Sequence, residues 1–388
     1  MEDTELERHL AAQITAQITA RITERIAAAG GWLPFDEFMA EALYAPGLGY
    51  YAAGRRIFGL APEGGSDFVT APELSPFFGR ALAVQVRDAL VATGTHEVVE
   101  FGAGSGALAE ALIEALDAAG EEGSCATRYT IVELSGALRA RQHARLARFG
   151  DRVRWVDAWP GEIRGVVVGN EVLDAMPVKL LRRRGVAWHE RGVVLSAAAD
   201  TFAFADLDAP FDLAGAGMAA SVLAEGGPFD EGTVTEIHPQ AEGFVASLAE
   251  RLVQGAALFF DYGFPEHEYY HPQRVGGTLM CHRAHRVDTD PLVDVGRKDI
   301  TAHVDWSGIA LAAQAAGLDV LGYTSQARFL INCGLVDLLA AATVAERAHA
   351  VKLVNEHEMG ELFKVMMLAR AIDLEPIGFA SGDRSHRL

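Results

Sequence analysis

The chain has 388 residues, of which 50% are hydrophobic and 22% charged, and its formal net charge is −20 with a pI near 5.0. These values are typical of a globular protein with a large core, and the acidic charge argues against nucleic acid as the main partner, because a phosphate backbone needs a concentrated basic surface. No apolar run approaches the roughly 18 residues of a membrane span, the start shows no signal sequence, and the three cysteines form no CxxC pair, so we expect a cytoplasmic protein in a reducing compartment.

The first predicted element is a helix over residues 4–28. Apolar residues recur at every fourth position from Leu6 to Ile26, and Gly30 and Gly31 end the pattern. Such a stripe indicates packing against the body of the same protein. Residues 32–80 are rich in Gly, Pro and Tyr and are predicted to form an ordered loop segment that lies over another part of the molecule.

An alternation of strands and helices begins at Glu97. Short apolar strands are predicted at 98–101, 129–133, 153–156, 166–170 and 256–263, with helices at 107–118 and 137–148. This order predicts an α/β fold with a doubly wound, mostly parallel sheet. Residues 180–230 interrupt the alternation with hairpin-like strands and an acidic stretch, which we interpret as an insertion after the fourth strand. Segments 320–323 and 362–368 are expected to supply further strands or helices.

A glycine-rich turn follows the first strand, in the segment Glu100-Phe101-Gly102-Ala103-Gly104-Ser105-Gly106. In open α/β sheets, ligands bind beyond the carboxyl ends of the strands, where glycines let the backbone approach them closely. Gly102, Gly104 and Gly106 alone fit a nicotinamide dinucleotide as well as S-adenosylmethionine.

Two carboxylates favour S-adenosylmethionine as the cofactor. The charge of Glu100, two residues before the first glycine, would repel a pyrophosphate and attract a cationic amino group and sulfonium. Glu133, at the end of the second strand, is placed to accept both ribose hydroxyls. The alternatives are nicotinamide or flavin binding, and a glycine turn that only packs a helix on a strand.

A second polar group follows the fourth strand, in the segment Asn170-Glu171-Val172-Leu173-Asp174-Ala175-Met176-Pro177. Three polar side chains here would be costly to bury unless they bind something. If the methyl acceptor is a guanidinium, Glu171 and Asp174 can hold it by bidentate hydrogen bonds and orient one nitrogen for attack, while Asn170 contacts the cofactor. Alternatively, Asp174 caps the next helix and Asn170 binds only the cofactor.

A motif of zinc proteases, HExxH, occurs at His267-Glu268-Tyr269-Tyr270-His271. Pro265 and Pro272 flank it, and a residue before proline is disfavoured in a helix, so the two histidines are not expected on one helical face. We therefore expect no metal.

Taken together, these motifs resemble the MidA-like (DUF185) family of class I methyltransferases, which includes the mitochondrial assembly factor of respiratory complex I. The resemblance covers residues 31–365 and includes the further segments 47–51, 67–73, 261–263 and 299–306. It implies a class I (Rossmann-like) methyltransferase core that binds S-adenosylmethionine. It also implies protein arginine N-methylation, with a complex I-type subunit as the substrate.

By the same resemblance, loops that carry Tyr51, Asp67 and Thr70 close over the cofactor, and His303 borders the acceptor channel as a catalytic residue. The implied parts are an N-terminal helical and cofactor-covering segment (1–95), the core (96–180 and 250–388) and an insertion for substrate recognition (181–249).

The partner implied by the resemblance is a protein that presents an arginine, and a homodimer is one possible assembly. The start of the chain, which lacks an Arg-rich presequence, fits a bacterial member. The alternative function is a non-catalytic assembly protein on a methyltransferase scaffold.

Overall fold

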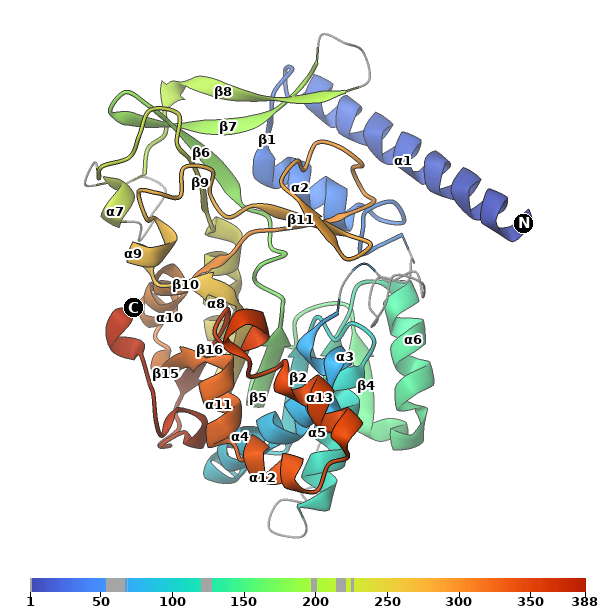
Figure 1. Cartoon of the computed structure of the whole chain (residues 1–388), viewed down its shortest axis with the longest axis vertical. Coiled ribbons are helices and arrows are strands. Elements are labelled where there is room, and N and C mark those ends of the chain that lie inside the picture. Colours follow the sequence, from blue (N-terminus) through green and yellow to red (C-terminus); the bar gives the residue numbers. More distant parts are fainter. Residues whose placement is uncertain are drawn as a thin grey trace.

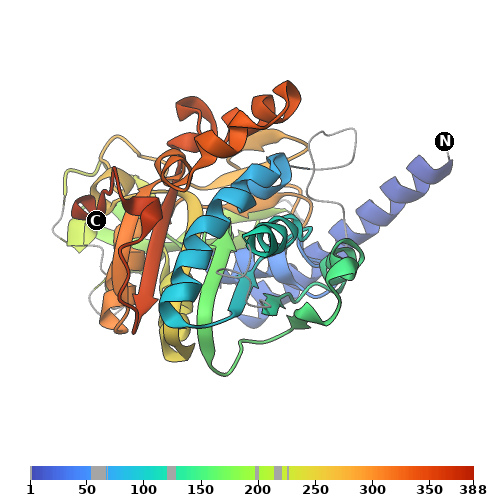
Figure 2. The same cartoon turned by 90° about the horizontal axis from the view of Figure 1, so that it is seen from below.

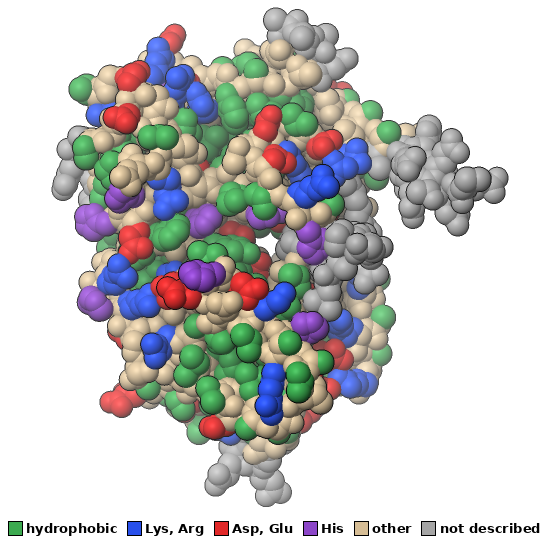
Figure 3. All heavy atoms as spheres, viewed as in Figure 1, with side chains coloured by type: hydrophobic (Ala, Val, Ile, Leu, Met, Phe, Trp, Pro, Cys, Tyr) green, Lys and Arg blue, Asp and Glu red, His purple; other side chains and the backbone are tan. Residues whose placement is uncertain are grey.

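The structure is a computed structural model that describes residues 2–53, 67, 69–119, 128–196, 201–213, 221–224 and 227–388. Residues 54–66 and 68, which belong to the predicted covering segment, lie outside the described residues. The described chain forms a large core below a smaller lobe in the view of Figure 1. Figure 3 shows that this face of the molecule is hollowed between the two.

The core contains a sheet in the order β15-β16-β10-β5-β2-β3-β4. From β4 to β10 all neighbours are parallel, whereas β16 is antiparallel to both β10 and β15. This arrangement confirms the predicted doubly wound, mostly parallel sheet, whose strand order reverses between β2 and β5. The strands are β2 (Glu97–Phe101), β3 (Arg128–Val132), β4 (Val153–Val156), β5 (Ile163–Asn170), β10 (Leu252–Phe264), β15 (Asp319–Ser325) and β16 (Phe363–Arg370), with β14 (Val304–Asp305) paired to the end of β10.

Helices cover both faces of this sheet (Figure 2). Successive strand residues point to opposite faces, and both sets are apolar, which is typical of strands buried on two sides. Val98 and Val166 belong to the core with α4 and α5, whereas Val99 and Val167 belong to the core with α8 and α10. The helices are α4 (Pro76–Thr93), α5 (Ala107–Ala118), α6 (Gly136–Leu146), α8 (Pro239–Arg251), α10 (Trp306–Ala315), α11 (Gln326–Asn332), α12 (Leu335–Ala340) and α13 (Val344–Val351).

The smaller lobe combines the N-terminal segment with the predicted insertion. Its antiparallel sheet joins β1 (Leu33–Pro34) to β6 (Lys179–Arg184), β7 (Ala187–Leu195), β8 (Phe202–Pro210) and β9 (Val234–Ile237). Helix α1 (Glu2–Ala28) buries Ile18, Ile22 and Ile26 in the core of this lobe, which confirms the predicted packing for this part of the stripe. The side chains of Leu6 and Leu10 lie outside the described residues. A second sheet, in the order β12-β11-β13, shares that core and comprises β11 (Met280–Arg283), β12 (Arg286–Asp288) and β13 (Asp299–Thr301).

The segment 32–80 is more regular than its composition predicts. Residues Phe35–Tyr44 form α2, because Phe35, Phe38 and Met39 supply a buried helical face. The remaining short elements are α3 (Ala71–Leu74), α7 (Ser221–Ala224), α9 (Glu266–Tyr269), η2 (Ala147–Arg152), η3 (Glu356–Gly360), η4 (Ile377–Phe379) and η5 (Ser385–Arg387). A search of the described residues for a helix long and apolar enough to cross a membrane finds none.

Candidate active site

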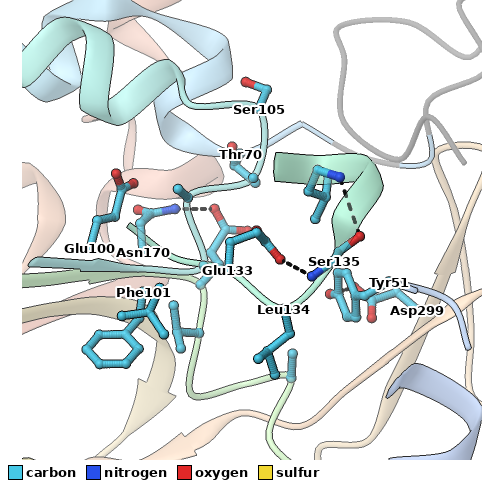
Figure 4. Close-up of a pocket in the computed structure, with 18 of the residues that line it drawn as sticks. Tyr51, Thr70, Glu100, Phe101, Ser105, Glu133, Leu134, Ser135, Asn170 and Asp299 are labelled. Carbon is cyan, nitrogen blue, oxygen red and sulfur yellow. Dashed lines mark hydrogen bonds between the residues drawn. The ribbon is translucent and has the colours of Figure 1, made fainter. Parts of the chain in front are cut away.

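A cavity of about 610 Å³ lies at the carboxyl ends of β2, β3 and β5, where the strand order reverses. Its size is that of a small-molecule site. The core contributes the strand ends and the glycine turn, and the smaller lobe contributes Tyr44 of α2 and the segment after it. Tyr51 of that segment is labelled in Figure 4. Of the residues predicted for the site, those that line the cavity are Tyr51, Thr70, Glu100, Gly102, Gly104, Glu133, Asn170, Glu171 and Asp174.

The glycine turn has a backbone conformation that favours glycine. Gly102, Gly104 and Gly106 have φ angles of 66°, 53° and 84°, in the left-handed region that favours glycine. A Cβ atom at Gly102 would lie 2.8 Å from Cγ2 of Val172. The turn therefore leaves room for a ligand against the backbone and none for a side chain at this position.

Glu100 is buried at the end of β2, with 2% of its surface exposed. Its Oε2 accepts a hydrogen bond from the hydroxyl of Tyr129 at 2.8 Å. Burial raises the pKa of Glu100 to about 8, against the opposing effect of the Tyr129 hydrogen bond, and the nearby charge of Glu133 raises it further. A cation in the cavity would stabilise the ionised carboxylate.

Glu133 follows β3 and faces the cavity with free acceptor capacity (Figure 4). Its Oε1 accepts from the Ser135 N–H at 2.7 Å, and its Oε2 accepts from Nε2 of Gln142 at 3.0 Å. Each carboxylate oxygen can accept a second hydrogen bond, so both ribose hydroxyls of a nucleoside can be bound. The same Gln142 amide donates to the Gly104 carbonyl at 3.0 Å, which ties the two loops together.

Asn170 supplies an unused acceptor to the cavity. Its Nδ2 donates to Oε1 of Glu171 at 2.9 Å, whereas its Oδ1 has no partner although the residue is only 8% exposed. A buried acceptor without a partner is costly, so this atom fits a ligand that donates a hydrogen bond.

Asp261 holds the segment that carries the predicted acceptor carboxylates. Its Oδ2 accepts hydrogen bonds from the backbone N–H groups of Val172, Leu173 and Asp174 at 3.1, 2.8 and 3.2 Å. Glu171 itself has a φ of 54°, which a non-glycine residue adopts only when its surroundings impose it. This segment leads through turns to β6, so the alternative that Asp174 caps a following helix is wrong.

Three carboxylates, those of Glu171, Asp174 and Asp299, line the cavity and lie close enough together to influence one another's pKa. Burial raises the pKa of each, to about 8 for Glu171 and about 7 for Asp299, and the charge of Asp174 further raises that of Glu171. Among the described residues that line the cavity, none is Lys or Arg. This acidic side is therefore suited to a cationic ligand.

Comparison with known proteins identifies the family. Residues 81–324 match the family model Methyltransf_28, described as S-adenosyl-L-methionine-dependent methyltransferase. The chain belongs to this family. It is similar to a Burkholderia thailandensis protein whose crystal structure is bound to S-adenosyl-homocysteine, with 49% identity, a TM-score of 0.89, and coverage of 97% of this chain and 98% of that one. The cofactor of this methyltransferase is S-adenosylmethionine.

Other relatives share less sequence identity with this chain than the Burkholderia protein does, but their names specify the residue that they methylate. The Drosophila melanogaster protein arginine methyltransferase NDUFAF7 homolog, mitochondrial, is 26% identical, with coverage of 90% of this chain and 86% of its own length. The human protein arginine methyltransferase NDUFAF7, mitochondrial, is 27% identical, with coverage of 86% of this chain and 79% of its own length.

Other residues predicted for the site lie beside the cavity of this methyltransferase. Asp67 accepts hydrogen bonds from the Tyr50 hydroxyl at 2.8 Å and the Ala284 N–H at 2.7 Å. His303 lies behind the cavity wall, with its ring 5.9 Å from that of Tyr262. Burial lowers the pKa of His303 to about 4, so its imidazole is neutral at physiological pH. Gly106, the N-cap of α5, is not among the residues that line the cavity.

The HExxH segment has no helix that spans both histidines, because α9 ends at Tyr269, before His271. Within the described part of the chain, no three His, Cys, Asp or Glu side chains are grouped to hold a metal. Sequence reasoning also missed the apolar wall beside Glu133, which is formed by Phe101, Val132, Leu134, Leu138 and Phe244. Leu134 in this wall is exposed, which only the structure reveals.

Proposed function

We propose that this methyltransferase modifies arginine side chains of a protein, and that its substrate is a subunit of a complex I-type enzyme. The observation that carries the proposal is the pair of carboxylates, the half-buried Glu171 and the buried Asp174, in a cavity whose described lining contains no Lys or Arg. The relatives named as protein arginine methyltransferases support the acceptor, and the resemblance noted in the sequence supports the choice of subunit.

The glycine-turn side of the cavity would hold the cofactor. The backbone at Gly102, Gly104 and Gly106 allows close approach, and Glu133 would accept the ribose hydroxyls. Oδ1 of Asn170 would accept a hydrogen bond from the amino group of the cofactor, which supplies an electrophilic methyl group when bound. Glu100 lies where its carboxylate would stabilise the cationic end.

Residues of the smaller lobe would cover the bound cofactor. Tyr51 and Thr70 line the cavity. Asp67 accepts a hydrogen bond from the hydroxyl of Tyr50, the residue before Tyr51, and so holds this loop in place. His303 would act from behind the wall, by holding Tyr262 in place.

The carboxylates would act mainly by positioning. A guanidinium stays protonated in water, and burying it without a charged partner costs several kcal/mol. Ion pairs with Glu171 and Asp174 would offset this cost, and they would also orient one nitrogen toward the methyl group. The attacking nitrogen gives up a proton after transfer, and a carboxylate whose pKa is raised by burial is a suitable acceptor for it.

The test is a comparison of arginine methylation by mass spectrometry in cells with and without the gene. We expect a methylated arginine that disappears with the gene, returns with the wild type, and does not return with Glu171→Gln. The isosteric variant should bind S-adenosylhomocysteine like the wild type and transfer methyl groups roughly 100-fold more slowly. Equal arginine methylation with and without the gene would refute the proposal, and cofactor binding without any methylation would favour a scaffold.

A further inference from the structure

We propose that Asp299 is a third carboxylate of the acceptor site and makes this site prefer a guanidinium to an ammonium group. The proposal rests on the proposed function and assigns a residue that neither the cofactor side nor the Glu171–Asp174 pair includes. Three observations support it: the contacts that position Asp299, the unused hydrogen-bond acceptors of its carboxylate, and the planar shape of a guanidinium.

Asp299 is tied directly to the segment that carries the other two carboxylates. It is the first residue of β13, lines the cavity and is 2% exposed. Three residues later in the same segment, the Ala302 N–H donates to the carbonyl of Asp174 at 3.0 Å. Asp299 lines the same cavity as Glu171 and Asp174, and its charge raises the pKa of both of these carboxylates.

Two tyrosines of the smaller lobe complete this side. The Tyr51 hydroxyl donates to Oδ2 of Asp299 at 2.8 Å. Its ring stacks on that of Tyr44, with 5.6 Å between centroids and 16° between planes. The Tyr44 hydroxyl in turn donates to the carbonyl of Ala175 at 2.7 Å, next to Asp174. The acceptor side is therefore closed by contacts between the lobe and both carboxylate-bearing segments.

The carboxylate of Asp299 keeps acceptor capacity, whereas those of Asp206 and Asp261 are occupied by other groups of the protein. Asp206 lies between two arginines, at 2.7 Å from Arg191 and 3.0 Å from Arg182. Asp261 accepts from four backbone N–H groups. Asp299 accepts one hydrogen bond at each oxygen, from Tyr51 and from the Ile300 N–H at 3.0 Å, whereas a carboxylate offers about four acceptor sites.

A second, independent feature of the cavity points to a ligand that donates hydrogen bonds. Oδ1 of Asn170 is buried in the same cavity without a partner, and Asn170 also donates to Glu171. The amino group of the cofactor would use this amide oxygen, so the unused acceptors of the carboxylates remain for a second ligand that brings both positive charge and several N–H groups.

A guanidinium fits three carboxylates better than an ammonium group does. It is planar, spreads its charge over three nitrogens and offers five N–H donors in a fixed fork, whereas an ammonium is a compact charge with three donors. Glu171 and Asp174 can bind two edges of such a plane, and Asp299 can take the donors that remain. Asp299 should therefore strengthen the binding of arginine more than that of lysine.

The experiment is isothermal titration of the full chain, saturated with S-adenosylhomocysteine, with N-acetyl-arginine amide and N-acetyl-lysine amide. For Asp299→Asn, we expect the arginine probe to bind roughly 10- to 100-fold more weakly, as for the loss of one hydrogen bond to a charged group. The lysine probe should weaken less, and affinity for S-adenosylhomocysteine should stay at the wild-type value.

Two further variants separate function from folding. Asp319→Asn, at an exposed acid of β15, removes the same charge away from the cavity and should leave all three affinities unchanged. Tyr51→Phe keeps the Asp299 charge and should weaken the arginine probe less than Asp299→Asn does. Because Asp299→Asn relieves repulsion among buried acids, it should unfold at the wild-type temperature or above, which a merely structural residue would not.

Three results would each overturn this inference. Wild-type affinity of Asp299→Asn for the arginine probe would overturn this inference alone, and so would an equal loss of cofactor affinity, which would place Asp299 on the cofactor side. A wild type that binds the lysine probe and not the arginine probe would overturn the proposed function and this inference together.

Discussion

The buried carboxyl group of Glu100 makes the stability of the protein depend on pH. Burial raises its pKa to about 8 in the folded state, whereas its ordinary value is 4.5. Between these pH values the folded protein holds a proton that the unfolded chain releases. The free energy of unfolding therefore falls as the pH rises from about 4.5 toward 8, and the contribution of Glu100 is most favourable at low pH.

The size of the effect follows from the two pKa values. Each pH unit in this range costs about 1.4 kcal/mol, so ionisation of the unfolded chain at Glu100 lowers the stability by about 3 kcal/mol at pH 7 and by about 1 kcal/mol at pH 5. Glu100→Gln keeps the shape of the protonated group and can still accept from Tyr129. Relative to the wild type, the variant should gain about 2 kcal/mol more at pH 7 than at pH 5, because steric costs of the substitution cancel in that difference.

The measurement is urea unfolding of wild type and Glu100→Gln at both pH values without cofactor. Glu97→Gln is the matched control, since Glu97 lies on the same strand and its carboxylate is paired with Arg154 at 2.6 Å. A stability difference that is the same at pH 5 and pH 7 would refute the reasoning. A gain of equal size in the control would assign the effect to net charge instead of burial.

Two further predictions concern binding and rate. Gly102→Ala should weaken S-adenosylhomocysteine roughly tenfold in calorimetry, because a left-handed conformation costs about 1–2 kcal/mol for L-residues and the new Cβ would lie 2.8 Å from Val172; unchanged affinity would show that the backbone there need not approach the cofactor. Burial and the charge of Asp174 raise the pKa of Glu171 to about 8, so the transfer rate should increase from pH 6 through pH 8 and level off only above that pKa, once the carboxylate is fully ionised. A flat pH profile would exclude Glu171 as the group that must be charged.

The cofactor side was predictable because its residues lie close together in the sequence. Glu100 and the three glycines span seven positions, and Glu133 and Asn170 each end a strand that the apolar pattern reveals. In a parallel sheet, strand ends meet at one edge, so local patterns were enough to bring these residues together.

The acceptor side was only partly predictable, because its members come from distant segments. Tyr51 and Asp299 are 248 positions apart, and Asp261 supports a turn that lies 87 to 89 positions before it. No local signal links such residues. For the same reason, the sequence pattern did not show that His303 lies behind Tyr262, outside the cavity lining.

The contact between Tyr51 and Asp299 can form only late in the synthesis of the chain. All strands that carry the glycine turn, Glu133 and Asn170 have been made once residue 170 has left the ribosome, so the nucleoside-binding half of the cavity has its parts early. The opposite wall of the cavity is complete only after residue 299 has been made. Strand β15 can pair only later still, because its only neighbour in the described sheet is β16, at residues 363–370. If the proposed roles hold, a nascent chain has the residues that bind the methyl donor well before those that bind the acceptor.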